Sequence, residues 1–311
     1  MSKLGKIIKR FLYSTKAPEV LFNYYANRKT TKSRRQLLDL LNSDEDLMNH
    51  LSDAQKKHWV PRIDDVLRCM DNQDIPRNPL AGKMVKDLLM MHNGIKIDPL
   101  SYYSLPMLKM LMVNQGVHEP QEEKIFQEVL KSLSSDRQLT MLELGAYWSF
   151  YSMWFQKIHP TADCYMVEPN RMNLFYGQLN CQLNQAKGTF IHSGIGKQVN
   201  PKENVTTVNT ICKKQNIDFI DLLHTDIQGY ELEMLEGCDQ MLSKKKVGYL
   251  FVSTHSNDLH YACQKLLTDK YAYQTVASAD LDETFCWDGI LVMKSPDYPG
   301  IEQVNISKKA K

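Results

Sequence analysis

Short apolar runs alternate with amphipathic segments between residues 139 and 293. The runs end in glycine, acidic or polar residues, and most of the segments between them place apolar residues at helical spacing. This pattern predicts an α/β domain with a parallel sheet and helices on both faces. Asp288-Gly289 predicts a tight turn into the last strand, which we expect to run antiparallel. We expect strands over residues 139–144, 164–167, 188–192, 217–225, 247–254, 273–278 and 290–293.

The chain divides into three parts on this pattern. Residues 1–110 are expected to be a helical extension, residues 111–300 the α/β domain, and residues 301–311 a polar tail. Within the extension, a short helix is predicted over 81–91. Residues 3–13 place apolar side chains on one helical face and basic side chains on the other, which suits a helix at a membrane surface or one that docks on a partner.

The segment from Gln138 to Asn184 has the order of a nucleotide-binding βαβ unit: a strand, Gly145-Ala146, a helix, a second strand, and an acid at its tip. Gly145 lets the backbone turn sharply and leaves room for a ligand against the main chain. Glu168 is placed to accept both hydrogen bonds of a ribose diol. The alternative is an α/β unit whose glycine only ends a strand.

The side chains of this loop indicate which nucleotide it binds. Dinucleotide sites need glycines two and five places after the first, where this chain has Tyr147 and Phe150. These side chains would block a pyrophosphate, but S-adenosylmethionine carries no phosphate. Glu143, before the glycine, suits the cationic, ammonium-bearing end of that cofactor. We therefore predict S-adenosylmethionine binding, with Tyr147, and Ser193 in the turn after the third strand, among the residues that contact it.

Candidate catalytic residues follow two later strands. Ligands of parallel sheets bind at the carboxyl ends of the strands, where Asp226 and His255 are expected. Asp226 is a candidate to accept the proton of a hydroxyl acceptor, to steer that hydroxyl, or to hold a divalent metal. His255 is a second candidate base with a pKa expected near neutrality, and His224 a weaker third. The structural alternatives are that Asp226 caps the next helix and that His255 bonds a neighbouring loop.

Composition narrows the class of protein. With 43% hydrophobic and 24% charged residues, the 311-residue chain is ordinary for a soluble globular protein. No apolar run reaches the roughly 18–20 residues that a membrane span needs, and the N-terminus lacks the apolar core of a secretory signal. The seven scattered cysteines contain no C-x-x-C pair, which argues against a disulfide framework or structural zinc and favours the cytoplasm. No H-x-E or D-x-D pattern at the strand ends supports a metal.

Positive charge is concentrated at the start of the chain. The net charge is only +2, but up to residue 35 basic residues face Glu19 as the sole acid. Such an arm can meet an anionic membrane surface or a nucleic acid, or it can be a solvated helix face. A nucleic-acid acceptor is not favoured, because the arm lacks the aromatic residues of an RNA-binding motif and the Asp226 segment lacks the signature of base methylation.

Four segments together resemble the FkbM-type methyltransferases: LELGAYWSFYSM, VEPNRMNLFYGQLNCQLN, IDLLHTDIQGYELEMLEG and VSTHSNDLH. The resemblance spans about residues 116–295. It implies a class I methyltransferase fold with a seven-stranded, mostly parallel sheet, and S-adenosylmethionine-dependent O-methylation of a sugar hydroxyl in a glycan. Carried over by position, it implies Asp226 at the reaction centre and a cofactor held by Glu143, Gly145, Ala146 and Glu168.

The chain departs from the family pattern at four positions. Tyr147 and Ser149 replace an asparagine and a glycine of the cofactor loop, while His224 and Gln228 replace a lysine and a glutamate around the fourth-strand acid. These departures predict weaker cofactor binding and a less acidic reaction centre. Tyr147 and Trp148 would then offer an aromatic wall for a sugar ring. The competing hypothesis is a binding or scaffold protein on a methyltransferase fold that does not catalyse.

Overall fold

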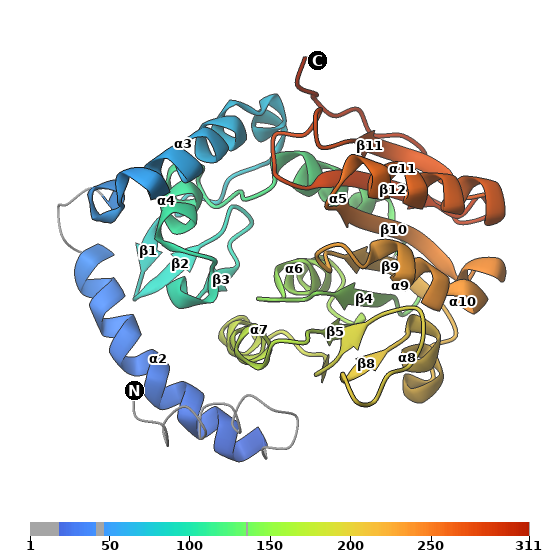
Figure 1. The fold of residues 1–311 in the computed structure, drawn as a ribbon, viewed down its shortest axis with the longest axis horizontal. Helices are drawn as coiled ribbons and strands as arrows, with labels where there is room; N and C mark the ends of the chain where they lie inside the picture. The colour runs from blue at the N-terminus through green and yellow to red at the C-terminus, as the bar shows by residue number, and fades with distance from the viewer. Residues whose placement is uncertain (1–18, 42–46, 135, 311) are drawn as a thin grey trace.

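A seven-stranded sheet forms the centre of the protein (Figure 1). The computed structural model describes residues 19–41, 47–134 and 136–310. All strands run parallel except β12, which is antiparallel to both of its neighbours, as predicted for the last strand. In sheet order the strands are β11 (Gln274–Ala279), β12 (Gly289–Lys294), β10 (Val247–Thr254), β9 (Ile220–Thr225), β4 (Thr140–Leu144), β5 (Asp163–Val167) and β6 (Thr189–Ile191). The predicted α/β fold class is confirmed.

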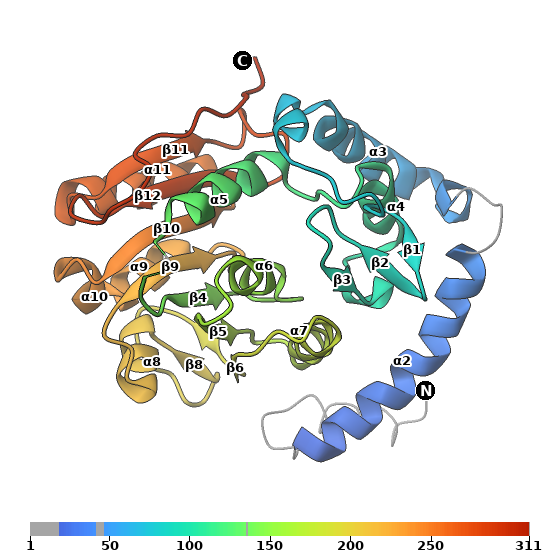
Figure 2. The same ribbon diagram turned by 180° about the vertical axis from the view of Figure 1, so that it is seen from behind.

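Helices cover both faces of this sheet because its central strands are apolar on both sides (Figures 1 and 2). In β10, Tyr249 and Phe251 point into one apolar layer, whereas Leu250 and Val252 point into the other. The first layer is covered by α5 (Pro120–Ser132), α6 (Phe150–Ile158) and α7 (Arg171–Leu183). The second is covered by α8 (Val208–Gln215), α9 (Glu231–Gly237), α10 (Asp239–Ser243) and α11 (Asn257–Lys265).

The extension lies beside the sheet domain and contains both helices and strands (Figures 1 and 2). The predicted helix over 81–91 is wrong, because this segment forms two strands joined at Lys86 and Asp87, whose φ angles are 49° and 63°. The segment 3–13 lies outside the described residues. The elements of the extension are α2 (Glu19–Leu41), η1 (Leu47–His50), α3 (Asp53–Arg68), η2 (Met70–Asp74), β1 (Met84–Val85), β2 (Leu88–Met90), β3 (Lys96–Ile97), η3 (Pro99–Ser101) and α4 (Leu105–Val113).

Three short elements complete the sheet domain. They are β7 (Gly194–Ile195), β8 (Val205–Thr206) and η4 (Leu266–Lys270). The tight turn predicted at Asp288-Gly289 is wrong, since residues 280–288 form a longer connection between β11 and β12. This connection reaches α5, where the side-chain oxygen of Gln121 accepts hydrogen bonds from the Thr284 hydroxyl and the Phe285 amide. No helix among the described residues is long and apolar enough to cross a bilayer.

Asparagine side chains of α7 attach the extension to the sheet domain. The Asn180 amide accepts a hydrogen bond from the Asp98 backbone at 3.0 Å and donates to the Ser101 hydroxyl at 3.1 Å. One turn later, the Asn184 amide accepts from the Lys96 backbone N–H at 2.9 Å and donates to its carbonyl at 2.6 Å. These bonds satisfy backbone groups of the extension with side chains of the domain, so the two parts share one interior.

The tail also returns to the extension. Asp71 is 2% exposed and accepts hydrogen bonds from the backbone N–H and hydroxyl of Ser307, at 2.9 and 2.7 Å. Lys124 of α5 pairs with the same carboxylate at 2.8 Å. Lys309 forms an ion pair with Asp65 of α3 at 2.8 Å. The residues after β12 therefore fasten the extension to the sheet domain from the other end of the chain.

The turn after β4 packs directly against the end of β9. Gly145 has a φ of 72°, and a Cβ at this position would overlap the carbonyl oxygen of Asp226. The Asp226 N–H donates to the Leu144 carbonyl at 3.0 Å. The N–H groups of Gly145 and Ala146 both donate to the Val167 carbonyl at 2.9 Å. The carboxyl ends of β4, β5 and β9 are thereby held in one arrangement.

We expect Gly145→Ala to lower the free energy of unfolding by at least about 3 kcal/mol, because it adds a steric overlap to an unfavourable φ. Gly229→Ala is the matched control, since Gly229 also has a positive φ (101°) but an added Cβ there would meet nothing within 4 Å. That control should lose only about 1–2 kcal/mol. Urea denaturation followed by circular dichroism measures both values, and equal losses would contradict the packing argument.

Candidate active site

A cavity of about 960 Å³ opens at the carboxyl ends of β4, β5, β6 and β9. This volume and position are typical of small-molecule sites in parallel α/β folds. The cavity is lined by five of the predicted site residues: Gly145, Tyr147, Glu168, Ser193 and Asp226.

Glu168 is held in place on the cavity wall by three protein donors. One carboxylate oxygen accepts from the Asn170 N–H at 2.7 Å and the Asn173 side-chain amide at 3.3 Å. The other oxygen accepts from the Tyr147 N–H at 3.0 Å. Burial raises the pKa of Glu168, against the opposing effect of these hydrogen bonds. A carboxylate has about four acceptor positions, so capacity remains for a ligand hydroxyl.

The loop after β4, which we predicted to bind the cofactor, has the left-handed backbone of a glycine-rich turn, but tyrosine and serine occupy its left-handed positions. Tyr147 and Ser149 have φ angles of 43° and 62°, in the left-handed region. Glycine and asparagine, the residues of the family pattern, enter this region at low cost, whereas tyrosine and serine are disfavoured there. The loop is thus formed against local preference and is stabilised by its contacts, including the bond from Tyr147 to Glu168.

The aromatic residues of the loop divide between cavity and core. Tyr147 lines the cavity beside Tyr103, with ring centroids 4.9 Å apart. Trp148 is 4% exposed and stacks on Phe150 at 5.0 Å inside the core. The aromatic wall predicted from Tyr147 and Trp148 is therefore wrong for Trp148, and the tyrosines that line the cavity with Tyr147 are Tyr103 and Tyr230. Phe150 does not line the cavity either.

Three other residues predicted to bind the cofactor, Glu143, Ala146 and Ser193, are buried and bonded within the protein. Glu143 is buried, accepts a hydrogen bond from the Ser152 N–H at 3.1 Å, and does not line the cavity. Burial raises the pKa of Glu143. Ala146 is also buried and contributes to the turn through its backbone. Ser193 lines the cavity, but its hydroxyl donates to the Asn204 carbonyl at 2.9 Å.

His255 lies among three carboxylates beside the cavity. Its Nδ1 is 3.0 Å from Glu231 Oε1, and its Nε2 is 3.3 Å from Asp226 Oδ1 and 3.4 Å from Asp288 Oδ1. Asp226 follows β9, His255 follows β10, Glu231 begins α9 and Asp288 precedes β12. Because β12 is antiparallel, its first residues meet the carboxyl ends of the parallel strands, and all four side chains gather there.

The charges in this cluster follow from burial and from the His255 contacts. Burial alone would lower the pKa of His255, but the Asp226 and Glu231 carboxylates raise it to about 10. Burial would raise the pKa of Asp226, and the His255 cation outweighs this and lowers it. Burial and the charges of Asp226 and Glu119 raise the pKa of Asp288 to about 7. His255 is therefore a cation at neutral pH and lacks the near-neutral pKa that we expected.

The carboxylate of Asp226 does not cap the following helix. The N-cap of α9 is Tyr230, which makes no side-chain capping bond. Glu231 instead accepts hydrogen bonds from the N–H groups of Ile227 and Gly229, at 3.3 and 3.1 Å. Asp226 accepts from the Gln228 side chain at 2.7 Å and otherwise faces His255 and the cavity.

His224 lies below Asp226 and is buried. Its Nε2 is 2.6 Å from Glu122 of α5, whose other oxygen accepts from the Ser253 hydroxyl at 3.3 Å. Three acids of this region, Glu122, Glu231 and Asp288, were not identified from the sequence. Acids at the start of a helix usually indicate a solvated helix end, and an Asp-Gly pair usually indicates a turn. The described residues contain no group of three or more His, Cys, Asp or Glu arranged to hold a metal.

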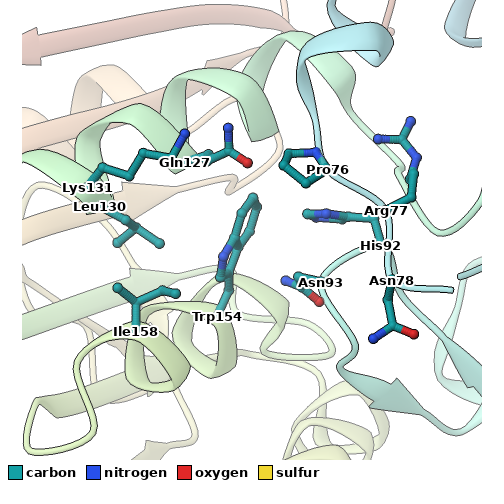
Figure 3. Close-up of a pocket in the computed structure, with 10 residues that line it drawn as sticks. All are labelled: Pro76, Arg77, Asn78, His92, Asn93, Gln127, Leu130, Lys131, Trp154 and Ile158. Atoms are coloured by element: carbon teal, nitrogen blue, oxygen red, sulfur yellow. The ribbon is translucent and has the colours of Figure 1, made fainter. Parts of the chain in front are cut away.

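A second cavity, of about 330 Å³, lies at the C-terminal ends of α5 and α6 (Figure 3). Figure 3 shows Trp154 between Leu130 and Ile158 on one side and His92 and Asn93 on the other. The chain passes from these helix ends into the first residues of β4 and β5. This cavity is therefore at the edge of the sheet where the parallel strands begin, whereas His255 is at the edge where they end. It is separate from the candidate active site.

The sheet order and its one reversed strand define the fold as that of a class I methyltransferase, and the cavity lies at the strand ends, where such sheets bind their ligands. Residues 197–275 match the model of the methyltransferase FkbM domain, which confirms the resemblance over this segment. The segment contains Asp226, Glu231 and His255. No curated protein matches the chain by sequence.

Solved structures similar to this chain include methyltransferases. TrmK from M. capricolum, in complex with S-adenosyl-homocysteine, is 12% identical with a TM-score of 0.41, covering 56% of this chain and 69% of that one. The METTL16 MTase domain is 12% identical with a TM-score of 0.43, covering 67% and 87%. Precorrin-6y C5,15-methyltransferase from Geobacter metallireducens is 14% identical with a TM-score of 0.38, covering 55% and 88%.

The raised pKa of His255 predicts a specific pH dependence of stability. Because its folded-state pKa of about 10 is above the ordinary value of 6.5, the protonated side chain stabilises the fold fully below about pH 6.5. This contribution is lost as the pH rises toward 10. We expect His255→Gln to be less stable than wild type at about pH 6, with the difference shrinking steadily up to about pH 10.

Urea denaturation at each pH measures this difference. His50→Gln, at an exposed position, is the control and should follow the wild-type pH dependence. A stability difference between His255→Gln and wild type that stays constant from about pH 6 to 10 would show that His255 is not held as a cation.

Proposed function

We propose that this protein transfers a methyl group from S-adenosylmethionine to a hydroxyl of a neutral saccharide. The observation that carries the proposal is the position of Asp226, which lines the cavity and faces the His255 cluster at once. A methyl donor bound in the cavity and an acceptor hydroxyl bound beside the His255 cluster would meet at the Asp226 carboxylate. Methyl transfer is an in-line displacement at the methyl carbon. Because the cofactor's methyl group is already activated, the protein has chiefly to bring the two reactants together in the right orientation.

The residues of the cavity fit the cofactor. Glu168 would hold the ribose diol, the turn at Gly145 and Tyr147 would lie along the methionyl part, and the backbone near Ser193 would approach the adenine. The carboxylate of Glu168 on the cavity wall suits a ligand that carries a sulfonium cation. When bound, the cofactor supplies an already activated methyl group.

Two carboxylates of the His255 cluster would have different roles toward the acceptor hydroxyl. Asp226, with its lowered pKa, stays ionised and would orient the acceptor hydroxyl by accepting its hydrogen bond. The pKa of Asp288, about 7, suits a group that receives the hydroxyl proton near neutral pH. His255 holds both carboxylates, and Glu231 holds the imidazole from its other nitrogen.

The charge of the cluster supports a neutral acceptor. Three acidic side chains, Asp226, Glu231 and Asp288, surround one imidazolium, and the negative charge on Asp226 raises the pKa of Asp288. A phosphate-bearing acceptor, such as a nucleic acid, would be repelled from this centre. Sugar hydroxyls, in contrast, are donors that carboxylates accept well. The FkbM domain match supports a methyltransferase role, and the acceptor class rests on this electrostatic argument.

A methyl-transfer assay over a panel of neutral glycosides, uronic acids and sugar phosphates tests the proposal. We expect turnover of neutral glycosides in preference to charged ones. Asp226→Asn should lower kcat by about 10²–10⁴-fold, because it removes the charged acceptor at the reaction centre. Its cofactor affinity, measured by calorimetry, should stay within about threefold of wild type, since Asp226 serves mainly the acceptor.

Asp269→Asn, an exposed acid near α11, is the control and should keep wild-type turnover. Absence of cofactor binding by wild type would leave the non-catalytic binding protein as the better account. Cofactor binding with turnover of sugar phosphates only would overturn the acceptor assignment, and full activity of Asp226→Asn would overturn the role of Asp226.

A further inference from the structure

Two tryptophans from distant parts of the chain meet beside the reaction centre. Trp59 of α3 stacks on Trp287, which precedes β12, with ring centroids 5.4 Å apart and planes 12° apart. Arg62, one turn further along α3, places its guanidinium carbon 3.8 Å from the centre of the Trp287 ring. Both ribbon views show α3 ending close to the connection that leads into β12 (Figures 1 and 2). The extension thus reaches the sheet domain at this point.

Trp59 and Arg62 of α3 lie on one face of Trp287, and part of the tryptophan stays exposed. The guanidinium carbon of Arg62 is only 5.7 Å from the centre of the Trp59 ring. Groups stacked on opposite faces of an indole would be about 7 Å apart, because each lies about 3.5 Å from the ring plane. Arg62 and Trp59 therefore lie on the same side, and Trp287 remains 42% exposed.

This surface is joined to the reaction centre through the next residue. Asp288 follows Trp287 directly, so their Cα atoms are about 3.8 Å apart. The Asp288 carboxylate is 3.4 Å from His255, in the same cluster as Asp226. The positive charge of Arg62 also acts on Asp288 and lowers its pKa, against the larger effect of burial. Trp287 and the carboxylate cluster are thus neighbours along the chain, and Arg62 acts on both.

We propose that the exposed part of Trp287 is the platform on which the acceptor's sugar ring stacks; this inference rests on the proposed saccharide O-methylation. A pyranose ring presents an apolar C–H face together with hydroxyls at its edge. The indole would bind the apolar face while the neighbouring carboxylates accept the hydroxyl hydrogen bonds.

The extension is then part of the acceptor site. Trp59 and Arg62 fix the plane of Trp287 from behind, so the platform is formed before the acceptor arrives. His58 packs edge-on against both indoles, with ring centroids 4.9 and 4.8 Å away. Ile63 and Val66, on the buried side of α3, belong to the main apolar core and hold the helix in place. Residues 58–62 thus position a surface that belongs to the sheet domain.

The test compares Trp287→Ala, Trp287→Phe and Trp59→Ala with wild type, using the best neutral glycoside from the panel. We expect Trp287→Ala to raise the acceptor KM about five- to tenfold, with kcat and cofactor affinity within about twofold. Trp287→Phe should recover most of the affinity, because it restores an aromatic face. Trp59→Ala should have an intermediate KM, because Trp287 loses its support. Quenching of intrinsic tryptophan fluorescence by the glycoside gives acceptor affinity without turnover.

Ile158→Ala is the control, since Ile158 is 47% exposed and lines the distant second cavity. It should leave the acceptor KM unchanged. Wild-type turnover with an unchanged KM in Trp287→Ala would overturn the platform and leave the proposed function intact. Cofactor binding without turnover of any saccharide would overturn both. Retained cofactor affinity in each variant shows that the variant is folded.

Discussion

The contact between the turn at Gly145 and the carbonyl of Asp226 sets the geometry of the whole site. It places the end of β9 against the end of β4 with no room for a side chain between them. Glu168 is tied to the same turn through the Tyr147 N–H. The cavity wall at Glu168 and the end of β9 at Asp226 are therefore one packed unit, in which Asp226 cannot move independently of the loop at Gly145.

Burial explains why most of the fold follows from the sequence. The central strands are apolar on both faces, and such runs between helical segments have few other interpretations. The prediction failed over residues 81–91, where two very short strands meet at Lys86 and Asp87. Neither residue is a glycine or asparagine, so the left-handed turn has no local signal. Its conformation is set by pairing and by packing against the rest of the extension, which residue preferences do not contain.

The sequence predicts those residues of the candidate site that directly follow a buried strand. Gly145, Glu168, Asp226 and His255 all follow buried strands, and the sheet brings them together without further information. Glu143 precedes its glycine in the same pattern, yet its side chain points into the interior. Asp288, Glu231 and the α3 residues beside Trp287 gave no such signal. Their roles depend on contacts across the sheet and between the two ends of the chain, so only the folded structure reveals them.

The attachment of Ser307 to Asp71 has a consequence for biosynthesis. Residues 53–71 are made before their partners, Trp287 and Ser307, which lie more than two hundred residues later in the sequence. β12 must also insert between β10 and β11 after both have been made. The contacts of the extension with Trp287 and Ser307 can therefore form only after its partners in α7, Asn180 and Asn184, have been made. A nascent chain that ends before Trp287 thus lacks the reversed strand, Asp288 and the contact of Trp287 with α3.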